Sequence, residues 1–468
     1  MLRLTSAVVV SILLVTGAAG SVEDGYADRL NADRSEARPG VTASQLQELL
    51  TANNYIDFAR ELPRAVGLTA DQTKYFRGTL AYREGRFGEV VDPLVDAVRA
   101  RDSALTATQK ENAFEILAQT EAKTFQYGSS AKMYGDIEAI YGAQMGDGLR
   151  EIQEKQHVAA LLERVPAETV RIFGDFAVRR DTEGGYPMRV GGKDFSAQLD
   201  TGASISLVSE STAKRWRVKL LAGEATLHGY GGGSFAARPG VVEELQIGKA
   251  ELHHVVVFVT ADANLYIAEI KRQTRAVLGY PVAAALGQLT FARDGTLSVS
   301  ADAAESRKGA PMWVGDGSLL VALGTEPVIE GDKLLGGTKE RLFELDTGSG
   351  NSYLTDRYLN ENRGLFKGDP PALARLAGAG GIHEIPAYQA RKLPLFFWCY
   401  AGTVLRAGCA DAAAGRRGRE LLRRGRAGCA AAVFELYAGF PGDADERGAV
   451  ESASSSVCGR RGGGRLHR

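Results

Sequence analysis

Cysteine is nearly absent from this chain and is confined to its end. None lies among the first 398 of the 468 residues, and all four fall in the last 70, at Cys399, Cys409, Cys429 and Cys458. The first 398 residues therefore contain no disulfide and no cysteine-based site. In an exported protein the four tail cysteines allow two disulfides in three connectivities, and the sequence favours none of them.

An excess of charge of either sign is also lacking. The formal net charge is -1 and the pI is about 6.6, which gives no signature of nucleic-acid binding or of attachment to a membrane surface. His253 and His254 are adjacent in a strand-like run, so they point to opposite faces, and no third metal ligand lies nearby. We therefore predict no metal and no cofactor.

Long hydrophobic runs are missing beyond the N-terminus, so we predict no stable membrane span in the rest of the chain. The N-terminus itself has one basic residue, Arg3, an apolar run from Ala7 to Thr16, and small residues up to Gly20. This order is typical of a signal peptide over residues 1–20, followed by a polar, flexible leader over 21–40. We expect an exported protein, periplasmic or secreted; an uncleaved membrane anchor is the alternative.

Residues 41–165 have helical spacing of apolar residues. Small residues at Gly78 and Ala81 and large ones at Tyr82 and Phe87 resemble a tetratricopeptide helix pair, and a looser copy follows about 40 residues later, where about 34 is usual. Two interpretations stay open. The helices form a groove for a protein partner, or they are a plain helical domain that covers one face of the strand-rich part of the chain.

Beyond residue 170 the pattern changes to β-branched runs bounded by Gly, Asp or Asn, which predict strands. The clearest runs are 187–190, 241–247, 253–259, 312–314, 319–323 and 327–329. A linker is expected at 302–308. The chain is thus predicted to be α+β and multidomain, with the helices first.

One motif occurs twice in the strand-rich part. Leu199-Asp200-Thr201-Gly202 and Leu345-Asp346-Thr347-Gly348 lie 146 residues apart, each after an apolar strand. Water becomes a nucleophile toward an amide when one carboxylate removes its proton while a second, protonated carboxyl polarises the carbonyl. Two carboxyls that close share one proton and titrate as a coupled pair. We therefore expect Asp200 and Asp346 to be catalytic, unless both motifs are ordinary strand-to-turn junctions, where Asp and Gly are common.

The other motif residues have expected roles of their own. Gly202 and Gly348 permit sharp turns, and the hydroxyls of Thr201 and Thr347 can brace one loop against the other. Ser349 follows the second motif where Ala203 follows the first. A hydroxyl bonded to Asp346 would favour its ionised form, so we expect Asp200 to retain the shared proton.

These motifs resemble the retropepsin-like and pepsin-like aspartyl protease family. The resemblance covers about residues 185–300, and the second motif resembles its duplicate. It implies an all-β acid-protease fold of two pseudo-symmetric lobes. It also implies a hydrophobic-hydrophobic-glycine segment beside the active loop, matched by Val277, Leu278 and Gly279, and a glycine-rich flap that binds substrate, matched by Gly229, Tyr230 and Gly231.

The second lobe follows the first only in part. Residues 378–384 lie where a second flap is expected, but no second hydrophobic-hydrophobic-glycine segment or convincing closing strands follow. After residue 397 the chain has no Lys, Ile, Asn, Gln or Met, and more than half of its last 70 residues are Arg, Gly or Ala. Either the reading frame changes near residues 391–399, which resequencing tests, or the tail is a native disordered segment.

The predicted organisation has six parts: a signal peptide at 1–20, a leader at 21–40, a helical domain at 41–165, a first lobe at 170–305, a partial second lobe at 306–397 and an anomalous tail at 398–468. The predicted activity is that of an aspartic endopeptidase acting on a peptide or protein substrate. The alternative is a catalytically impaired protease fold that binds a partner through its helices. A homodimer that pairs two first lobes is a further alternative for the active site.

Overall fold

The computed structural model describes most of the helical region and the first lobe, and parts of the second lobe and the tail. The described residues are 40–100, 102–229, 233–267, 272–292, 294–301, 312–315, 317–324, 327–330, 333–337, 340–349, 352–354, 356–361, 372–379, 381–390, 395–399, 403–407 and 436–439. The predicted signal peptide, the leader up to residue 39 and the linker at 302–308 lie outside them. Within the described part, no helix has the length and apolar character needed to cross a membrane.

The predicted helical N-terminal region is confirmed. It consists of α2 (Ala43–Thr51), α3 (Tyr55–Glu61), α4 (Ala70–Arg83), α5 (Val91–Arg99), α6 (Ala107–Lys123), α7 (Tyr127–Met145) and α8 (Gly148–Leu161). Three of these helices begin at a capping box, in which a threonine side chain and a glutamine side chain each accept the other residue's backbone N–H. The pairs are Thr42 with Gln45, Thr69 with Gln72, and Thr106 with Gln109.

Small residues let neighbouring helices approach closely. A Cβ added to Gly78 of α4 would lie 2.7 Å from Cδ2 of Leu94 on α5, so glycine is needed at this crossing. The predicted second helix pair falls on α6 and α7, which pack against each other. The assignment of these pairs to a tetratricopeptide repeat stays a prediction.

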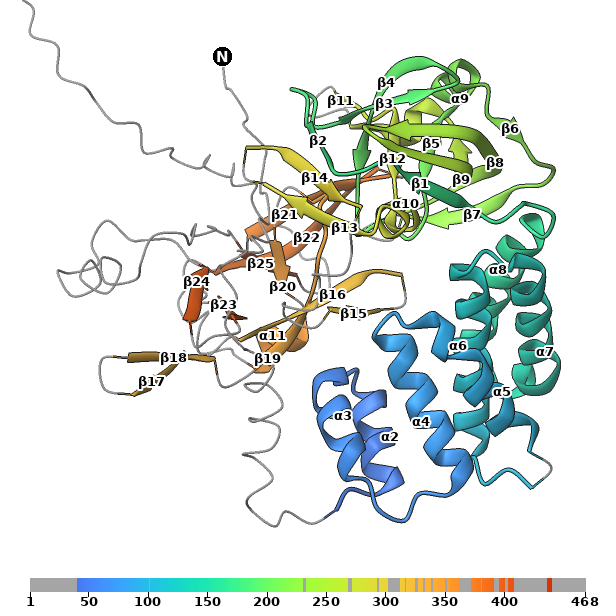
Figure 1. Ribbon diagram of the computed structural model, residues 1–468, viewed down its shortest axis with the longest axis vertical. Coiled ribbons are helices and arrows are strands. Elements are labelled where there is room, and N and C mark those ends of the chain that lie inside the picture. Colours follow the sequence, from blue (N-terminus) through green and yellow to red (C-terminus); the bar gives the residue numbers. More distant parts are fainter. Residues whose placement is uncertain are drawn as a thin grey trace, which may run out of the picture.

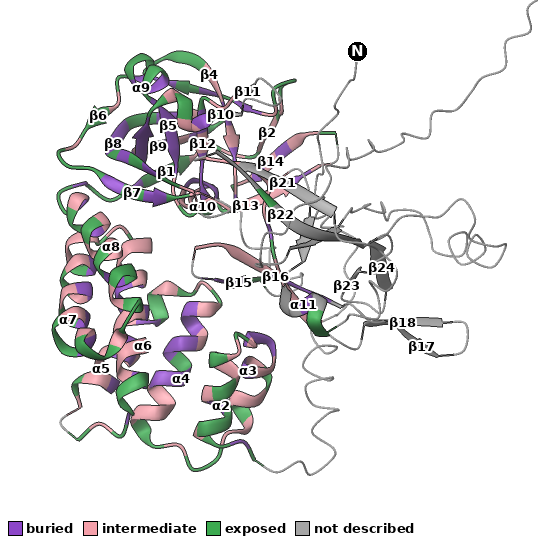
Figure 2. Ribbon diagram, turned by 180° about the vertical axis from the view of Figure 1, so that it is seen from behind, coloured by how far each residue is buried: buried purple, intermediate pink, exposed green. Residues whose placement is uncertain are grey.

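The first lobe is built on one large sheet. Its principal strands are β1 (Thr169–Ile172), β3 (Tyr186–Val190), β4 (Lys193–Leu199), β5 (Leu207–Ser209), β6 (Lys219–Leu220), β8 (Ser234–Ile247), β9 (Ala250–Thr260) and β12 (Ala276–Leu278), in the order β1-β9-β5-β12-β4-β3-β8-β6. In β3, Tyr186, Met188 and Val190 are buried and alternate with exposed residues, as the period of a strand requires. The buried face packs into one core with β9 and β12, and Figure 2 shows buried residues of this sheet in purple.

Further strands and two helices flank this sheet. The hairpin of β7 (Ala225–His228) with β8 projects from the sheet toward the helical region (Figure 1). A separate sheet joins β2 (Phe176–Arg179), β14 (Thr296–Ser300) and β13 (Gln288–Phe291). The helices α9 (Glu210–Trp216) and α10 (Tyr280–Ala285) follow β5 and β12.

The second β-rich part repeats the order of elements around its Asp-Thr-Gly motif. In the first lobe β4 leads to Asp200, then to β5 and α9; here β19 (Glu340–Glu344) leads to Asp346, then to β20 (Ser352–Leu354) and α11 (Asp356–Glu361). A hairpin of β21 (Ala372–Gly378) and β22 (Gly381–Ala390) follows, at the place expected for a second flap. Its other strands are β15 (Met312–Val314), β16 (Leu319–Gly324), β17 (Pro327–Glu330), β18 (Lys333–Gly337) and β23 (Leu395–Cys399).

The expectation that the anomalous tail contributes no strands is wrong in two places. The strand β24 (Thr403–Ala407) pairs with β23, and β25 (Leu436–Gly439) lies between β20 and β22. Neither segment alternates apolar and polar residues clearly. The strand β24 forms a hairpin with its neighbour β23, whereas β25 depends on partners far away in the sequence. The rest of the tail lies outside the described residues.

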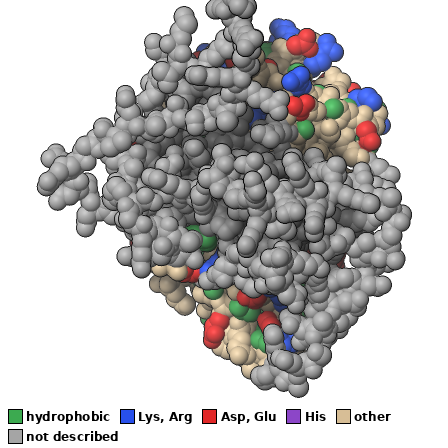
Figure 3. Space-filling view, turned by 90° about the vertical axis from the view of Figure 1, so that its left-hand side faces the viewer, with side chains coloured by type: hydrophobic (Ala, Val, Ile, Leu, Met, Phe, Trp, Pro, Cys, Tyr) green, Lys and Arg blue, Asp and Glu red, His purple; other side chains and the backbone are tan. Residues whose placement is uncertain are grey.

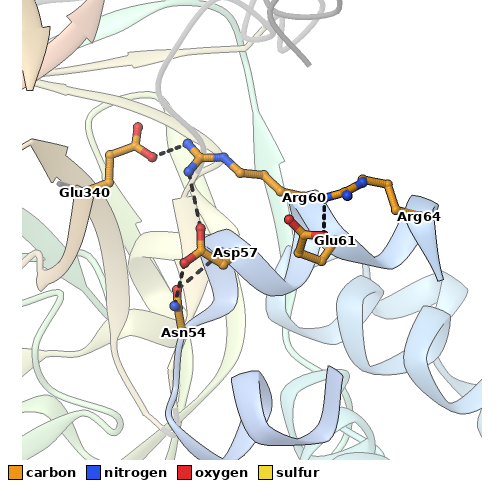
Figure 4. A network of polar contacts seen from close by, with 6 residues as sticks. All are labelled: Asn54, Asp57, Arg60, Glu61, Arg64 and Glu340. Atoms are coloured by element: carbon orange, nitrogen blue, oxygen red, sulfur yellow. Dashed lines mark hydrogen bonds and ion pairs between the residues drawn. The ribbon is translucent and has the colours of Figure 1, made fainter. Parts of the chain in front are cut away.

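The helical region packs against the second lobe as well as the first. Tyr55 and Ile56 of α3 share a buried cluster with Trp313 of β15 and Ala322 of β16. Arg60 of α3 pairs with Glu340 at the start of β19, and Figure 4 shows this contact beside the helix's own polar network. The described side chains on the face in Figure 3 carry charges of both signs, in keeping with the balanced composition.

Candidate active site

The two Asp-Thr-Gly loops lie against each other. Asp200 directly follows β4, and Asp346 lies two residues after the end of β19. A Cβ added to Gly202 would lie 2.6 Å from Cγ of Asp346, and one added to Gly348 would collide with the carboxyl group of Asp200. Each glycine therefore makes room for the carboxyl of the opposite loop, and the structure brings the two aspartates together within one chain.

Reciprocal hydrogen bonds join the loops. The backbone N–H of Thr201 donates to Oγ1 of Thr347 at 3.1 Å, and the N–H of Thr347 donates to Oγ1 of Thr201 at the same distance. Each hydroxyl in turn donates to the carbonyl of the leucine before the opposite aspartate: Thr347 to Leu199 at 2.8 Å, and Thr201 to Leu345. The loops are thus held in register by four hydrogen bonds related by pseudo-twofold symmetry.

The carboxyl groups have matching backbone donors. Oδ1 of Asp200 accepts from the N–H groups of Gly202 at 2.9 Å and Ala203 at 3.2 Å. Oδ1 of Asp346 accepts from the N–H groups of Gly348 at 2.8 Å and Ser349 at 2.9 Å. These bonds orient both carboxyls.

The pKa of Asp200 lies well above its usual range. Burial is the largest cause, followed by the negative charge of Asp346 and a hydrogen bond with its side chain; the two backbone donors only partly offset them. Asp200 therefore holds a proton under conditions in which an isolated aspartate is ionised. A neutral and an ionised carboxyl side by side can polarise a carbonyl and deprotonate a water.

The segment Val277-Leu278-Gly279 lies directly beside the first loop. Val277 and Leu278 of β12 pair in parallel with Gln198 and Leu199 of β4. The N–H of Asp200 donates to the carbonyl of Leu278 at 2.9 Å. A Cβ on Gly279 would lie 2.5 Å from the carbonyl oxygen of Ile205, so the strand end and the loop touch through backbone alone.

Residues 186–282 match the aspartyl protease family. The matched segment runs from β3 into α10, contains Asp200 and the Val277–Gly279 segment, and ends before Asp346. No curated protein matches the chain. The match supports an aspartyl protease domain over residues 186–282 and the hydrolase class.

The predicted flap of this aspartyl protease domain falls on the β7–β8 hairpin. The N–H of Gly229 donates to the carbonyl of Gly233 at 2.7 Å and closes the described end of the hairpin. A side chain at Gly229 would collide with the carbonyl oxygen of Ala379, in the turn between β21 and β22. Tyr230 and Gly231 lie outside the described residues, so their role in the flap stays a prediction.

Sequence reasoning missed three residues around the protease loops. The side-chain amide of Gln198 donates to the carbonyl of Gly348 at 3.1 Å, and the guanidinium of Arg180 donates to that of Thr347 at 3.4 Å. Burial and the charge of Asp346 raise the pKa of Glu344. The signal for Gln198 and Glu344 was their position two residues before each aspartate, because residues i and i+2 share one face of a strand. The sequence position of Arg180 gives no indication that this residue lies near the second loop.

Proposed function

We propose that the chain is an aspartic endopeptidase that hydrolyses peptide bonds through a water molecule activated between Asp200 and Asp346. The observation that carries this proposal is the pairing of the two loops, in which Thr201 and Thr347 exchange backbone hydrogen bonds across the pseudo-twofold axis. The family match over residues 186–282 supports it independently. The substrate is a peptide or a protein.

The proposed reaction assigns one role to each carboxyl. Asp200, whose pKa is raised, donates its proton to the scissile carbonyl oxygen, while the Asp346 carboxylate takes a proton from the attacking water. The water oxygen bonds to the carbonyl carbon and forms a tetrahedral intermediate. As the C–N bond breaks, Asp346 gives its proton to the leaving nitrogen, and Asp200 recovers its proton from the hydroxyl that becomes the new carbonyl.

A cleavage assay tests this function. Under acidic conditions the purified chain is expected to cleave a denatured protein, with inhibition by pepstatin. Asp200→Asn keeps the shape of the side chain but removes its acid–base function, and we expect cleavage to fall about 100- to 10,000-fold. Cleavage that continues in Asp200→Asn at the rate of the unchanged chain would contradict the proposal.

One observation favours a second candidate, a binding protein with an impaired protease fold. In the first lobe β12 lies between β4 and β5, whereas no described strand bridges β19 and β20 in this way; β20 instead pairs with β25. A loop with weaker support holds its carboxyl less well, and a misplacement of about 1 Å can cost about 100-fold in rate. A folded chain with no cleavage would favour this candidate, with the helices as the binding surface.

We also propose that the chain is exported to the periplasm or secreted. Support comes only from the sequence of residues 1–20, which has the order of basic, apolar and small residues of a signal peptide. Expression of the full chain followed by N-terminal sequencing of the mature protein tests this. An intact Met1 on a membrane-bound product would favour the uncleaved anchor.

A further inference from the structure

The helical region contacts the predicted flap hairpin through α8. This helix runs beside β7, and Figure 1 shows the two elements adjoining where the helices meet the first lobe. Gly223, which precedes β7, has a φ of +89°, and a side chain there would collide with Leu161 of α8. The end of α8 and the base of the hairpin are therefore in direct contact.

An apolar cluster extends this contact to the active loop. Leu162 and Val165, which follow α8, are buried with Leu227 of β7 and Phe235 of β8. Ile205, in the loop after Asp200, packs against the same cluster. A shift of the hairpin relative to α8 would therefore displace the loop after Asp200, because close-packed side chains transmit displacement.

Two polar contacts fix β7 to the same helix, one near each end. Nε2 of His157 lies 2.7 Å from the carbonyl oxygen of Glu224, which precedes β7. Nε2 of His228, the last residue of β7, lies 3.2 Å from Oε2 of Glu154. Glu154 and His157 are three residues apart, so they lie on one face of α8.

Glu154 is held in place for this contact. Its other oxygen, Oε1, accepts from Nε of Arg150 at 3.0 Å, one turn earlier on α8. The carboxylate therefore bridges the helix and the hairpin with one oxygen each. His228 immediately precedes Gly229, whose N–H closes the described end of the hairpin and whose backbone lies against Ala379.

We propose that Glu154 is a positioning residue of the protease: through His228 it sets the placement of the β7–β8 hairpin relative to the active loop. The helical region would then contribute to substrate binding without touching the dyad. The expected change in KM rests on the proposed peptidase function. The placement of the hairpin can be measured whether or not the chain cleaves peptides.

The test reverses the charge and then restores the pair. Glu154→Lys removes the oxygen that contacts His228, and the double variant Glu154→Lys/His228→Glu builds an ion pair at the same place. Since partly exposed pairs are weak, we expect Glu154→Lys to raise KM about three- to fivefold with kcat changed less than twofold. The double variant should return KM to within about twofold of the unchanged chain.

Glu151→Lys is the matched control, because it makes the same charge change on α8. Glu151 forms an ion pair with Lys155 of the same helix, and this pair does not involve the hairpin. We expect the KM of this variant to stay at the starting value. Equal effects of Glu151→Lys and Glu154→Lys would overturn the proposal, since the result would then reflect the net charge of α8.

Hydrogen exchange separates this inference from the proposed function. Amides of residues 225–229 and 233–237 are expected to exchange faster in Glu154→Lys and at the original rate in the double variant, whether or not the chain cleaves peptides. Unchanged exchange in Glu154→Lys would overturn the proposal. A chain without cleavage but with altered and restored exchange would refute the peptidase function only.

Discussion

At the scale of single residues, the site depends on groups that have two partners each. Thr201 is buried, its hydroxyl donates to Leu345, and the same oxygen accepts from the N–H of Thr347. One side chain thus satisfies a backbone donor and a backbone acceptor of the other loop. Removing such a group destabilises the protein by more than the loss of a single hydrogen bond, because it leaves a buried N–H and a buried carbonyl without hydrogen-bond partners.

We expect Thr201→Val to destabilise the protein by about 2–3 kcal/mol, because it keeps the shape of threonine but leaves the N–H of Thr347 and the carbonyl of Leu345 unsatisfied. Thermal unfolding measures the change. Thr201→Ser retains the hydroxyl and serves as the control, with a loss below about 1 kcal/mol. Equal losses in the two variants would show that the methyl group, and not the hydroxyl, supports the loops.

The difference between Ala203 and Ser349 predicts a change in pH dependence. Ala203→Ser adds a hydroxyl near Asp200 that can donate to its carboxylate and so lower the raised pKa of Asp200. The proposed mechanism needs Asp200 protonated, so the basic limb of the kcat/KM profile should move to lower pH, by about 0.5–1 pH unit. A basic limb that stays in place in Ala203→Ser would count against this role.

At the scale of elements, the segment between α8 and β1 links the helices to the first lobe and carries a buried acid. Glu168 lies in it, with Oε1 buried and without a hydrogen-bond partner. Burial raises the pKa of its side chain from 4.5 to about 7. The folded state therefore binds more protons than the unfolded state between these values, and the free energy of unfolding falls as the pH rises through this range.

Glu168→Gln should remove this pH dependence, because the amide is neutral at every pH. The pKa difference corresponds to a decrease of about 3 kcal/mol in the free energy of unfolding between pH 4.5 and 8. We expect the variant and the unchanged chain to differ in thermal midpoint mainly at pH 8, where the variant should be the more stable. Glu163→Gln, at an exposed position close by, is the control and should show no such difference.

Local chemistry explains what was predictable from the sequence at this scale. The Asp200 and Asp346 turns and the strands around them depend on short patterns, so the sequence alone was enough to locate them. The role of Gln198 was missed because its partner, Gly348, is 150 residues away. The tail strands β24 and β25 were missed because the composition of the tail favours no element. The strand β24 pairs with the neighbouring β23, and β25 pairs with the distant β20 and β22.

At the scale of the whole molecule, the helical region supports both lobes. It packs on the first lobe through α8, and on the second through Trp313 of β15. The Trp313 side chain is 3% exposed, and its ring centroid lies 6.5 Å from that of Tyr55. Arg83 of α4 lies 4.4 Å from the same tyrosine ring and donates to the carbonyl of Val314 at 3.3 Å. No local pattern in the sequence predicts this interface, because it joins segments that lie more than 200 residues apart in the chain.

Trp313→Ala should weaken the attachment of the second lobe, with a loss of about 3–5 kcal/mol from the cavity it leaves. The indole N–H of Trp313 is buried without a hydrogen-bond partner, so Trp313→Phe keeps most of the packing and loses no hydrogen bond. We expect limited proteolysis to cut residues 312–345 faster in Trp313→Ala than in Trp313→Phe. Equal rates in both variants and the unchanged chain would contradict a supporting role for this contact.

In the proposed enzyme, one chain supplies both carboxyls of the active site, Asp200 and Asp346. The measurement that tests it most directly is kcat/KM for a peptide with the unchanged chain, with Asp200→Asn, with Asp346→Asn, and with an equal mixture of the two variants. We expect cleavage by the unchanged chain, loss in each variant and no recovery in the mixture. Cleavage retained in Asp346→Asn would instead indicate a homodimer of first lobes, and recovery in the mixture would indicate a dyad assembled between two chains.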